Sequence, residues 1–551
     1  MPGESQVRPN AEVNAPEYLA FAAPYFYLHS MYSTFTTIEK GLRQLVKGDV
    51  WFDIEKRKEY STAKCLYRIM PVGVVAPKDT DDVRHIITLC AENDIAVIPR
   101  GGGTGLAGQA VGFGLILDFT KHMNHVLSVS EETSSVTVEA GCILSDLNAI
   151  LQPTKTFYPI DPQSARTCTV GGTIATNAAG AHGLRYGSTK NQLKNLTAVF
   201  SNGDLCSVNP IEEHSHLSAE TERRFMETKK LLVREKEVLR GHVPKVEKSS
   251  SGYNIFEAMS GDNFDATRLL CGSEGTLAIV TQATLNIEAV PETRAAALAY
   301  FESYEKTAEA IQVAREFSPS AIELLDKSYT EIGKGISPLS DRFINRDFKT
   351  MLLIEFEGGK EVGECLNDLH AALLRSDLLL DWHTLESNDE RIAMWQLRET
   401  ATEQLNALPS RQRKISTFED GAVPVRNLPS YLAGMKTILE KYSIPFIAYG
   451  HAGSGHIHCT TIGEIETESG RKLIDDATRE MFDLIIRLDG TLSAEHGDGF
   501  VRTPFLERAF GPDIYRIFTE IKRIFDPQNI LNPQKIVGKQ NGVFLHDIKY
   551  A

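Results

Sequence analysis

The sequence predicts an α+β protein in which two successive domains each contain a sheet with helices packed beside it. Residues 73–98 have the pattern of a strand, an amphipathic helix and a second strand. Beyond Pro291 a second series of strand and helix patterns begins, so we place a domain boundary near residue 290. Further short strand patterns, separated by turns, lie at 114–118, 125–129, 135–140 and 197–200.

The other elements of the first domain follow from local composition. Residues 1 to about 40 are polar and contain several prolines before they turn aromatic, which predicts an extended arm packed on a domain. The acidic residues at 79–82 mark a helix start, because carboxylates are favourable at the N-terminal end of a helix. Residues 220–240 are rich in charge and predict a solvated helix, and residues 271–287 predict a closing pair of strands.

The second domain begins with strand patterns at 295–300, 321–325 and 350–356, and the apolar spacing at 306–317 predicts a helix. We find no fixed-period repeat and no low-complexity tract. The sequence is therefore divided into an N-terminal arm with helices, a first domain, a second domain and a C-terminal segment, with the ranges 1–64, 65–290, 291–510 and 511–551.

The composition excludes several classes of protein. The chain has 551 residues, and its 58 Lys and Arg against 73 Asp and Glu give a formal net charge of −15 at pH 7, which argues against nonspecific binding to nucleic acid. No run approaches the ~20 apolar residues of a membrane-spanning helix. The N-terminus lacks the pattern of a signal or transit peptide. We expect a cytoplasmic protein, and peripheral association with a membrane stays open.

The eight cysteines are dispersed along the chain and form no Cys-x-x-Cys pair. This spacing disfavours a thiolate zinc site, an iron–sulfur cluster and a thioredoxin-type redox pair. We therefore expect reduced thiols buried in the core.

Three runs of small residues in the first domain suggest a site for a long, flat ligand. The first run, 99–105, follows the strand at 96–98, and its consecutive glycines let backbone N–H groups approach a phosphate without obstruction by Cβ atoms. It has the spacing of neither a Rossmann fingerprint nor a P-loop. The others cover 169–183 and 271–277. A flexible turn is the alternative for any single run, but three together match what a dinucleotide lying against backbone requires.

These motifs carry a family resemblance. Arg-Gly-Gly-Gly-Thr-Gly at 100–105, Val-Gly-Gly-Thr-Ile-Ala-Thr-Asn-Ala-Ala-Gly at 170–180, Arg-Tyr-Gly at 185–187 and Gly-Ser-Glu-Gly-Thr-Leu at 272–277 resemble the FAD-binding domain of vanillyl-alcohol-oxidase (PCMH) type flavoproteins. Over about residues 65–537 the chain resembles the FAD-dependent D-2-hydroxyacid dehydrogenases, which include D-lactate dehydrogenase, the glycolate oxidase FAD subunit and D-2-hydroxyglutarate dehydrogenase.

The resemblance implies a two-subdomain FAD-binding domain over 65–290, a C-terminal α+β substrate (cap) domain with the metal site over 291–510, and a C-terminal segment that returns to the FAD domain. The loop 100–105 is expected to hold the FAD pyrophosphate. Thr104 stands where histidinyl-linked relatives place a His, so FAD is expected to be noncovalent. The expected FAD contacts are Arg100, Gly101, Gly102, Gly103, Thr104, Gly105, Asp161, Ser164, Gly171, Gly172, Asn177, Gly180, Glu274, Gly275, Ile279 and, in the Pro-bounded turn 525–535, Asn532.

Two histidine motifs in the second domain suggest a metal site. The first places His451, His456 and His458 within eight residues, after the apolar strand 445–448, and the second adds Glu495 and His496. Neutral imidazoles with one carboxylate suit a borderline divalent cation such as zinc, manganese or iron. A single His on a strand is more often a hydrogen-bonded core or surface residue, but four gathered in two glycine-flanked motifs indicate a catalytic metal site.

The resemblance assigns roles to these residues. The family pattern Gly-His-x-Gly-Asp-Gly-Asn-x-His matches at His451 and His458, and Glu-His-Gly matches at 495–497. It implies that His451, His458 and Glu495 bind the metal, with zinc expected first and manganese or iron as alternatives. It also implies that His496 is the general base.

The chain departs from the family pattern at three positions. Ser454 stands where the family has Asp, and His456 stands where it has Asn. His456 is therefore either an extra metal ligand or a substrate contact. Thr460 stands where hydroxyglutarate enzymes carry Asn, which weakens the transfer of that substrate to this chain.

Residues 395–402 resemble the segment with which the family binds the substrate carboxylate. Arg398 is able to bind a carboxylate through two hydrogen bonds, and Thr402 lies one helical turn later on the same face. The alternative for Arg398 is an ion pair on a helix surface. Lys414 or Arg413 would match a further basic position of the family.

These residues predict an FAD-dependent, metal-assisted oxidation of a D-2-hydroxy acid, such as D-lactate, glycolate or D-2-hydroxyglutarate, to the 2-oxo acid. Since the chain has no cluster-binding cysteines, the expected acceptor is external and other than NAD: a quinone, cytochrome, electron-transfer flavoprotein or iron–sulfur partner. No nucleic acid partner or integral membrane segment is expected, and a homodimer stays open. The alternatives are a redox-neutral transferase resembling alkylglycerone-phosphate synthase and a metal-binding protein with a vestigial flavin site.

Overall fold

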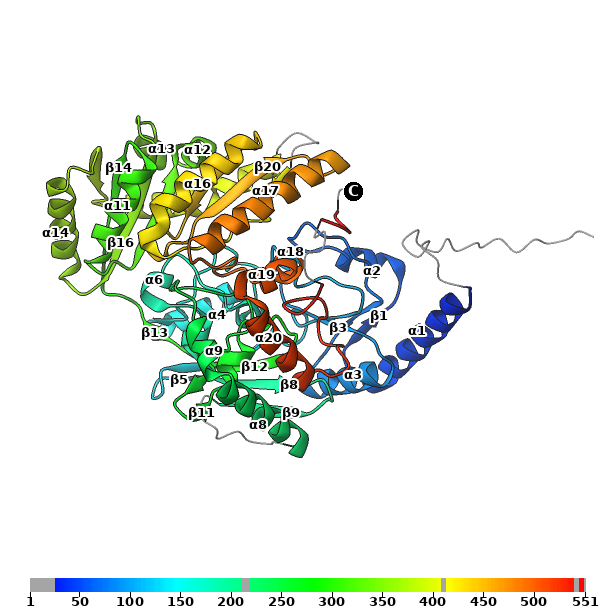
Figure 1. Ribbon diagram of the computed structural model, residues 1–551. Coiled ribbons are helices and arrows are strands. Elements are labelled where there is room, and N and C mark those ends of the chain that lie inside the picture. The colour runs from blue at the N-terminus through cyan, green and yellow to red at the C-terminus, as the bar shows by residue number, and fades with distance from the viewer. Residues whose placement is uncertain (1–24, 210–217, 408–412, 540–544, 550–551) are drawn as a thin grey trace, which may run out of the picture.

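The computed structural model describes residues 25–209, 218–407, 413–539 and 545–549. In this part of the chain the strands form sheets of four, five and seven strands and two short two-stranded pairs. The four- and five-stranded sheets come from the first half of the chain, and the seven-stranded sheet comes from the second half (Figure 1).

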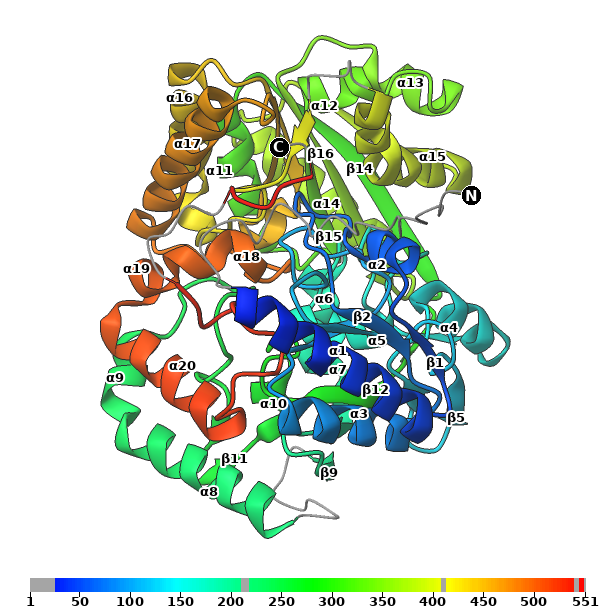
Figure 2. The same cartoon turned by 90° about the vertical axis from the view of Figure 1, so that its right-hand side faces the viewer.

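The four-stranded sheet has the order β1-β2-β4-β3, in which β2 and β3 run parallel to β4. Helix α3 begins where the acidic residues predict, and the Asp79 side chain caps it by accepting from the backbone N–H of Asp82. Helices α1 and α3 lie side by side on this sheet (Figure 2). The elements are α1 (Tyr25–Leu45), β1 (Asp49–Trp51), α2 (Ile54–Tyr60), β2 (Gly73–Ala76), α3 (Thr80–Glu92), β3 (Val97–Arg100) and β4 (Leu115–Asp118).

The prediction of an extended arm up to about residue 40 is wrong over residues 25–40, which form most of α1. Ile38 and Leu42, four residues apart on one helix face, are fully buried and share a core with Val83 and Ile86 of α3. This burial stabilises the helix in a segment whose aromatic composition does not favour it. Residues 1–24 lie outside the described part of the chain.

The five-stranded sheet is antiparallel, with the order β5-β6-β12-β8-β9. The predicted strand pair at 271–287 is wrong: its main strand is β12, between β6 and β8, and a turn precedes it in which Gly272 and Gly275 have positive φ. The predicted helix at 220–240 is broken at Glu235 and buries Phe225 and Leu232 on one face, so it is not fully solvated.

The elements of this region are β5 (Val126–Ser130), β6 (Ser135–Glu139), α4 (Leu144–Leu151), η2 (Gln152–Thr154), β7 (Thr156–Phe157), α5 (Val170–Thr176), α6 (Gly183–Tyr186), α7 (Thr189–Gln192), β8 (Leu193–Val199), β9 (Leu205–Val208), α8 (Ala219–Arg234), α9 (Lys236–Gly241), β10 (Met259–Ser260), β11 (Asn263–Phe264), α10 (Ala266–Leu270), β12 (Ile279–Asn286) and β13 (Glu288–Ala289). The short pairs are β10 with β11 and β7 with β13. Both pairs lie outside the five-stranded sheet.

The seven-stranded sheet is antiparallel, with the order β17-β14-β16-β15-β19-β20-β18. Helices α11, α14, α16 and α17 share a core with one face, and α12, α13 and α15 share a core with the other. Covered faces explain why every residue of β15 and all but the last residue of β16 are buried.

The elements of this region are β14 (Thr293–Phe301), α11 (Tyr304–Arg315), β15 (Ala321–Asp326), α12 (Lys327–Ile332), α13 (Pro338–Ile344), β16 (Thr350–Gly358), α14 (Val362–Arg375), β17 (Asp381–Thr384), α15 (Asn388–Thr400), η3 (Ala401–Ala407), β18 (Arg413–Ile415), η4 (Val425–Asn427), α16 (Leu428–Lys441), β19 (Phe446–Gly450), η5 (Ala452–Ser454), β20 (His458–Gly463) and α17 (Glu468–Arg487). The strands predicted at 295–300, 321–325 and 350–356 correspond to β14, β15 and β16. The predicted helix at 306–317 corresponds to α11.

The last helices lead the chain back to the first half. Helix α20 buries its apolar face in the core of the five-stranded sheet, beside α8 (Figure 1). Beyond α20, Leu531 forms a parallel bridge with Val97 of β3. The elements are α18 (Gly499–Arg502), η6 (Thr503–Phe505), α19 (Leu506–Phe510) and α20 (Pro512–Phe525).

None of the helices in the described ranges is long and apolar enough to cross a membrane. All eight cysteines are free thiols; Cys365 is partly exposed and the others are buried. The prediction of reduced, buried thiols therefore agrees with the structure at every position except Cys365.

Candidate active site

A cavity of about 950 Å³ is lined by residues from both halves of the molecule. This volume lies at the upper end of the range of roughly 300–1,000 Å³ that is usual for small-molecule sites. One wall consists of the small-residue runs of the first half, and the facing wall carries the histidine motifs of the second half.

The glycine wall is closely packed backbone. A Cβ on Gly102 would lie 1.9 Å from the carbonyl oxygen of Thr167, and one on Gly101 would lie 2.2 Å from Oγ1 of Thr169. Thr169 in turn caps α5 by accepting from the N–H of Gly172, at 3.1 Å. The loop after β3 therefore lies directly on the start of α5, and both present backbone to the cavity.

Arg100 lines the cavity and also holds this loop. One terminal nitrogen donates to the carbonyl oxygens of Tyr60 and Thr62, at 3.2 and 2.9 Å, and the guanidinium lies over the Tyr60 ring. Burial lowers the pKa of Arg100. Arg100 therefore joins the glycine loop to residues 60 and 62.

All the residues predicted to contact FAD line the cavity except two, Asn177 and Gly180. Asn177 ends α5 in a left-handed conformation and accepts from the N–H of Lys190, at 3.0 Å. A Cβ on Gly180 would lie 2.2 Å from Oδ1 of Asp161, so Gly180 allows that side chain to reach the wall. These two residues do not line the cavity but support the residues that do.

Asn532 is aimed at the cavity as the sequence predicts. Its side-chain amide donates to the carbonyl oxygens of Gln109 and Glu274, at 3.1 and 2.7 Å. Its Oδ1 is buried and has no hydrogen-bond partner among the described residues. A buried acceptor without a partner beside small-residue backbone fits a bound flavin, which offers N–H groups.

Glu274 joins the two halves at the base of the cavity. It accepts from the backbone N–H groups of Asp498 and Gly499, at 2.6 and 3.0 Å. Burial and the nearby Asp498 carboxylate raise its pKa to about 8. Glu274 therefore fixes the loop that carries the second histidine motif.

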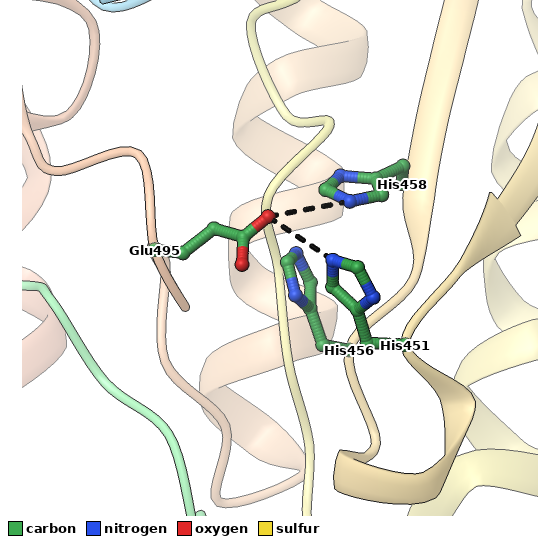
Figure 3. Close-up of side chains that lie close together, drawn as sticks. All are labelled: His451, His456, His458 and Glu495. Carbon is green, nitrogen blue, oxygen red and sulfur yellow. Dashed lines mark hydrogen bonds and ion pairs between the residues drawn. The ribbon is translucent and has the colours of Figure 1, made fainter. Parts of the chain in front are cut away.

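The metal-ligand candidates converge on the facing wall (Figure 3). Nε2 of His451 lies 3.3 Å from Oε1 of Glu495, and Nε2 of His458 lies 3.5 Å from the same oxygen. Gly450, with φ +141°, is the last residue of β19 and comes directly before His451, and a Cβ on it would lie 3.2 Å from the His458 ring. The two distant segments meet as the sequence predicts.

Each of these imidazoles is held from behind. Nδ1 of His451 lies 2.7 Å from Oε1 of Glu323, and Nδ1 of His458 lies 3.2 Å from the carbonyl oxygen of Glu419. An imidazole held at one nitrogen by an oxygen acceptor, with the other facing a carboxylate, is typical of metal-binding histidines. Two imidazoles and a carboxylate are a donor set that fits a divalent cation.

His456 belongs to the same cluster but is oriented differently from its neighbours. It is fully buried, its ring lies 4.4 Å from that of His458, and it does not line the cavity. Burial and the neighbouring His458 lower its pKa to about 3, so the ring is neutral. The substrate-contact alternative for His456 therefore has no support in the geometry.

Glu495 has a second partner that the sequence did not suggest. The ammonium of Lys248, from the loop after α9, is buried and forms an ion pair with Oε2 of Glu495. The other carboxylate oxygen faces the imidazoles. No sequence signal pointed to Lys248, which lies in a polar, serine-rich loop.

His496 lies next to these groups and is surrounded by acids. Its Nδ1 is 2.8 Å from Oε1 of Glu419, and its Nε2 is 3.6 Å from Oε1 of Glu495. Burial opposes protonation, but Asp420 and Glu419 outweigh it and raise the pKa of His496 to about 9. Asp420 also accepts from Ser493 and from the N–H of His496, at 2.5 and 2.9 Å, which fixes the loop.

Arg398 lies in the cavity wall, buried over the Tyr449 ring. Its Nε donates to Oε2 of Glu323 at 2.6 Å, so the same carboxylate holds Arg398 and His451. The surface ion pair considered as an alternative is therefore wrong. Glu323 could have been suspected from sequence, because it is a lone carboxylate within the apolar strand 321–325.

The remaining substrate candidates also line the cavity. Thr402 lies at the start of η3, with its Oγ1 3.4 Å from Nε2 of Gln163. Lys414 is partly buried, and desolvation lowers its pKa, whereas Arg413 forms an ion pair with Glu466 at 2.9 Å. Of these two cations, Arg413 already pairs with a carboxylate, so Lys414 is the better candidate for a substrate contact.

Comparisons with known proteins identify the family. Residues 71–209 match the family described as FAD binding domain, and residues 290–536 match the family described as FAD linked oxidases, C-terminal domain. The glycolate oxidase subunit GlcD of Bacillus subtilis is 31% identical over 484 residues, covering 86% of this chain and 90% of that protein. The chain belongs to the FAD-linked oxidase family.

Other members of this flavoenzyme family are similar to the chain. A D-lactate dehydrogenase of Archaeoglobus fulgidus is 30% identical, covering 85% of this chain and 91% of that protein. A D-2-hydroxyglutarate dehydrogenase of Pantoea ananatis is 28% identical and covers 91% of this chain, but the chain spans about half (51%) of that relative.

A solved structure of p-cresol methylhydroxylase superposes with a TM-score of 0.69 at 14% identity, covering 93% of this chain and 98% of that one. At this identity the likeness concerns the fold alone. It confirms the predicted α+β fold of the vanillyl-alcohol-oxidase (PCMH) type.

Proposed function

We propose that this flavoenzyme oxidises a 2-hydroxycarboxylate to the 2-oxo acid, with noncovalent FAD and a divalent cation, and passes the electrons to an acceptor on another molecule. Glycolate, D-lactate and D-2-hydroxyglutarate, after which the relatives are named, are all 2-hydroxycarboxylates. The observation that carries the proposal is the meeting of His451, His458, Glu495 and His496 on the cavity wall that faces the glycine loop.

The proposal assigns residues to both groups. The glycine wall and Asn532 would hold FAD, and Thr104 offers no imidazole for a covalent link. His451, His458 and Glu495 would hold the cation. When bound, FAD supplies a hydride acceptor and a divalent cation supplies Lewis acidity toward the substrate oxygens.

Arg398 binds the substrate carboxylate. Its Nε is occupied by Glu323, which leaves the terminal guanidinium nitrogens to pair with an anion in the cavity. Thr402, on the same wall, adds a hydroxyl donor. Together they fix which face of the substrate C2 carbon is presented to the glycine wall.

His496 receives the proton of the substrate hydroxyl at Nε2, while Glu419 holds Nδ1 and orients the ring. Oxidation removes this proton and the C2 hydride, and leaves a carbonyl group at C2. His496 must be neutral to act, and its acidic neighbours oppose that state. A divalent cation held by Glu495 would add positive charge beside His496. That charge would offset the neighbouring carboxylates, lower the pKa of His496 and favour its neutral form.

The test is anaerobic addition of glycolate, the two enantiomers of lactate and the two enantiomers of 2-hydroxyglutarate to the FAD-replete, metal-loaded protein. We expect one D-2-hydroxy acid or glycolate to bleach the visible flavin absorption, with one 2-oxo acid formed per flavin. For lactate or 2-hydroxyglutarate the L-enantiomer of the same acid is the matched control; glycolate is achiral and has none. If none of the acids bleaches the flavin, the proposal is rejected in favour of a redox-neutral transferase or a metal-binding protein.

A further inference from the structure

We propose that His456 is itself a ligand of the divalent cation, so that this chain provides three imidazoles and one carboxylate. The inference rests on the metal site of the proposed function. The proposed function assigns three ligands, His451, His458 and Glu495. The inference adds a fourth, because His456 stands where the pattern Gly-His-x-Gly-Asp-Gly-Asn-x-His has Asn.

The first observation is that His456 has unused binding capacity. Its side chain is fully buried, and neither ring nitrogen has a hydrogen-bond partner in the part of the chain that the structure describes. Nε2 lies 3.0 Å from Oδ1 of Asp420, but the two are not aligned as a hydrogen bond. Buried polar groups nearly always have partners, so an imidazole without one in a polar cluster indicates a missing ligand.

The second observation is where this ring lies. One ligand atom each from His451, His456, His458 and Glu495 all fall within 4.8 Å of one another. Figure 3 shows the three rings grouped around the Glu495 carboxylate. The group is compact enough for one cation to contact all four after small side-chain rotations.

The third observation excludes a contact with substrate. His451, His458 and Glu495 line the cavity, whereas His456 does not. Its backbone is fixed by a bridge to Ala422, close to the acids at 419 and 420. His456 therefore approaches the cluster from the protein interior rather than from the cavity.

A third imidazole changes which cation the site prefers. Imidazole nitrogen suits zinc, cobalt and iron, whereas carboxylate, carbonyl and water oxygens suit manganese and magnesium. Replacing an amide position by imidazole therefore directs the site toward zinc-like ions and strengthens their retention.

The experiment uses the FAD-replete protein, stripped with a chelator and reloaded with Zn²⁺ or Co²⁺. Zinc affinity is measured by competition with a chromophoric chelator. The ligand set around Co²⁺ is monitored by the visible difference spectrum of the cobalt-loaded protein. The variants are His456→Asn, His451→Asn and His383→Asn. His383 is the matched control, because its Nε2 is also buried and without a partner among the described residues, yet its ring packs on Phe343, outside the cluster.

We expect His456→Asn to weaken zinc binding by at least about tenfold and to alter the cobalt spectrum, because a direct ligand is lost. FAD content stays the same, and His383→Asn behaves as the wild type. Wild-type zinc affinity and an unchanged cobalt spectrum in His456→Asn overturn the inference. If His451→Asn still weakens binding in that case, the metal site of the proposed function stands.

Failure of the wild-type protein to bind zinc or cobalt overturns both the inference and the metal part of the proposed function. Flavin bleaching tests the redox part separately. Should His456→Asn fail to fold, X-ray absorption of the zinc-loaded wild type decides the matter. Three imidazoles per zinc support the inference, and two overturn it.

Discussion

The two walls of the cavity are built by different means. The wall from the first half consists of backbone, and its glycines leave no room for a Cβ at Gly101 or Gly102. The facing wall consists of buried charged and imidazole side chains, of which His451 and His496 are held by the carboxylates of Glu323 and Glu419. We therefore expect substitutions in the first wall to act through volume and those in the second to act through charge.

The largest effect should come from the charged wall. We expect His496→Asn to slow flavin reduction by substrate about 10²- to 10⁴-fold, the usual contribution of a general base. FAD content should be unchanged, because His496 lies on the wall opposite the glycine loop. Stopped-flow reduction under anaerobic conditions measures the effect, and reduction at the wild-type rate would remove His496 as the base.

Arg398→Met tests the charge of the same wall toward substrate. We expect KM to rise about 10- to 100-fold, since hydrogen bonds to charged groups contribute about 1.5–3 kcal/mol. Steady-state kinetics with an artificial electron acceptor measure this change. Arg342→Met, an exposed position on α13, is the matched control. An unchanged KM would exclude Arg398 from substrate binding.

Gly102→Ala tests the backbone wall. The new methyl group would overlap the carbonyl of Thr167, and overpacking of this kind costs about 1–3 kcal/mol, so we expect FAD to bind about 10- to 100-fold more weakly. Gly363→Ala, with open space around its Cβ, should bind FAD as the wild type does. Zinc affinity should be the same in both variants. Loss of zinc together with FAD would contradict the separation of the two walls.

The smallest effect concerns the junction between the walls. His182 lies between Asp161 of the first half and Glu355 of β16, with its ring nitrogens 2.6 and 3.0 Å from their carboxylates. Burial opposes its charge, but both carboxylates outweigh burial and raise the pKa of His182 well above 6.5. The raised pKa favours a protonated imidazole at this junction between the two halves.

We expect His182→Gln to lower the free energy of unfolding by about 2 kcal/mol at pH 6. Because the folded-state pKa is raised, the stabilisation is complete below the unfolded pKa of about 6.5 and is lost as pH rises through the raised value. Chemical denaturation of both proteins across this range should show the difference shrinking at alkaline pH. A difference that grows with pH would show that His182 is not protonated in the folded state.

The sequence predicted the features that depend on residues close together in the chain. Glycine runs and the histidine motifs at 451–458 and 495–496 are short segments whose chemistry is visible without a partner. The helical state of residues 25–40 was missed because it depends on packing against α3. Lys248 and the supporting acids were missed because their positions are set by strands and loops far away in the chain.

The closing bridge between Val97 and Leu531 has a consequence for biosynthesis. The N–H of Asn532 donates to the carbonyl oxygen of Val97, so the glycine loop is completed only by residues more than four hundred positions later. A ribosome-bound chain stalled before this point lacks the last piece of the pocket and should not retain flavin. The flavin-binding wall is therefore complete only once residues 531 and 532, which follow both large sheets of the first half and the seven-stranded sheet in the chain, have been added.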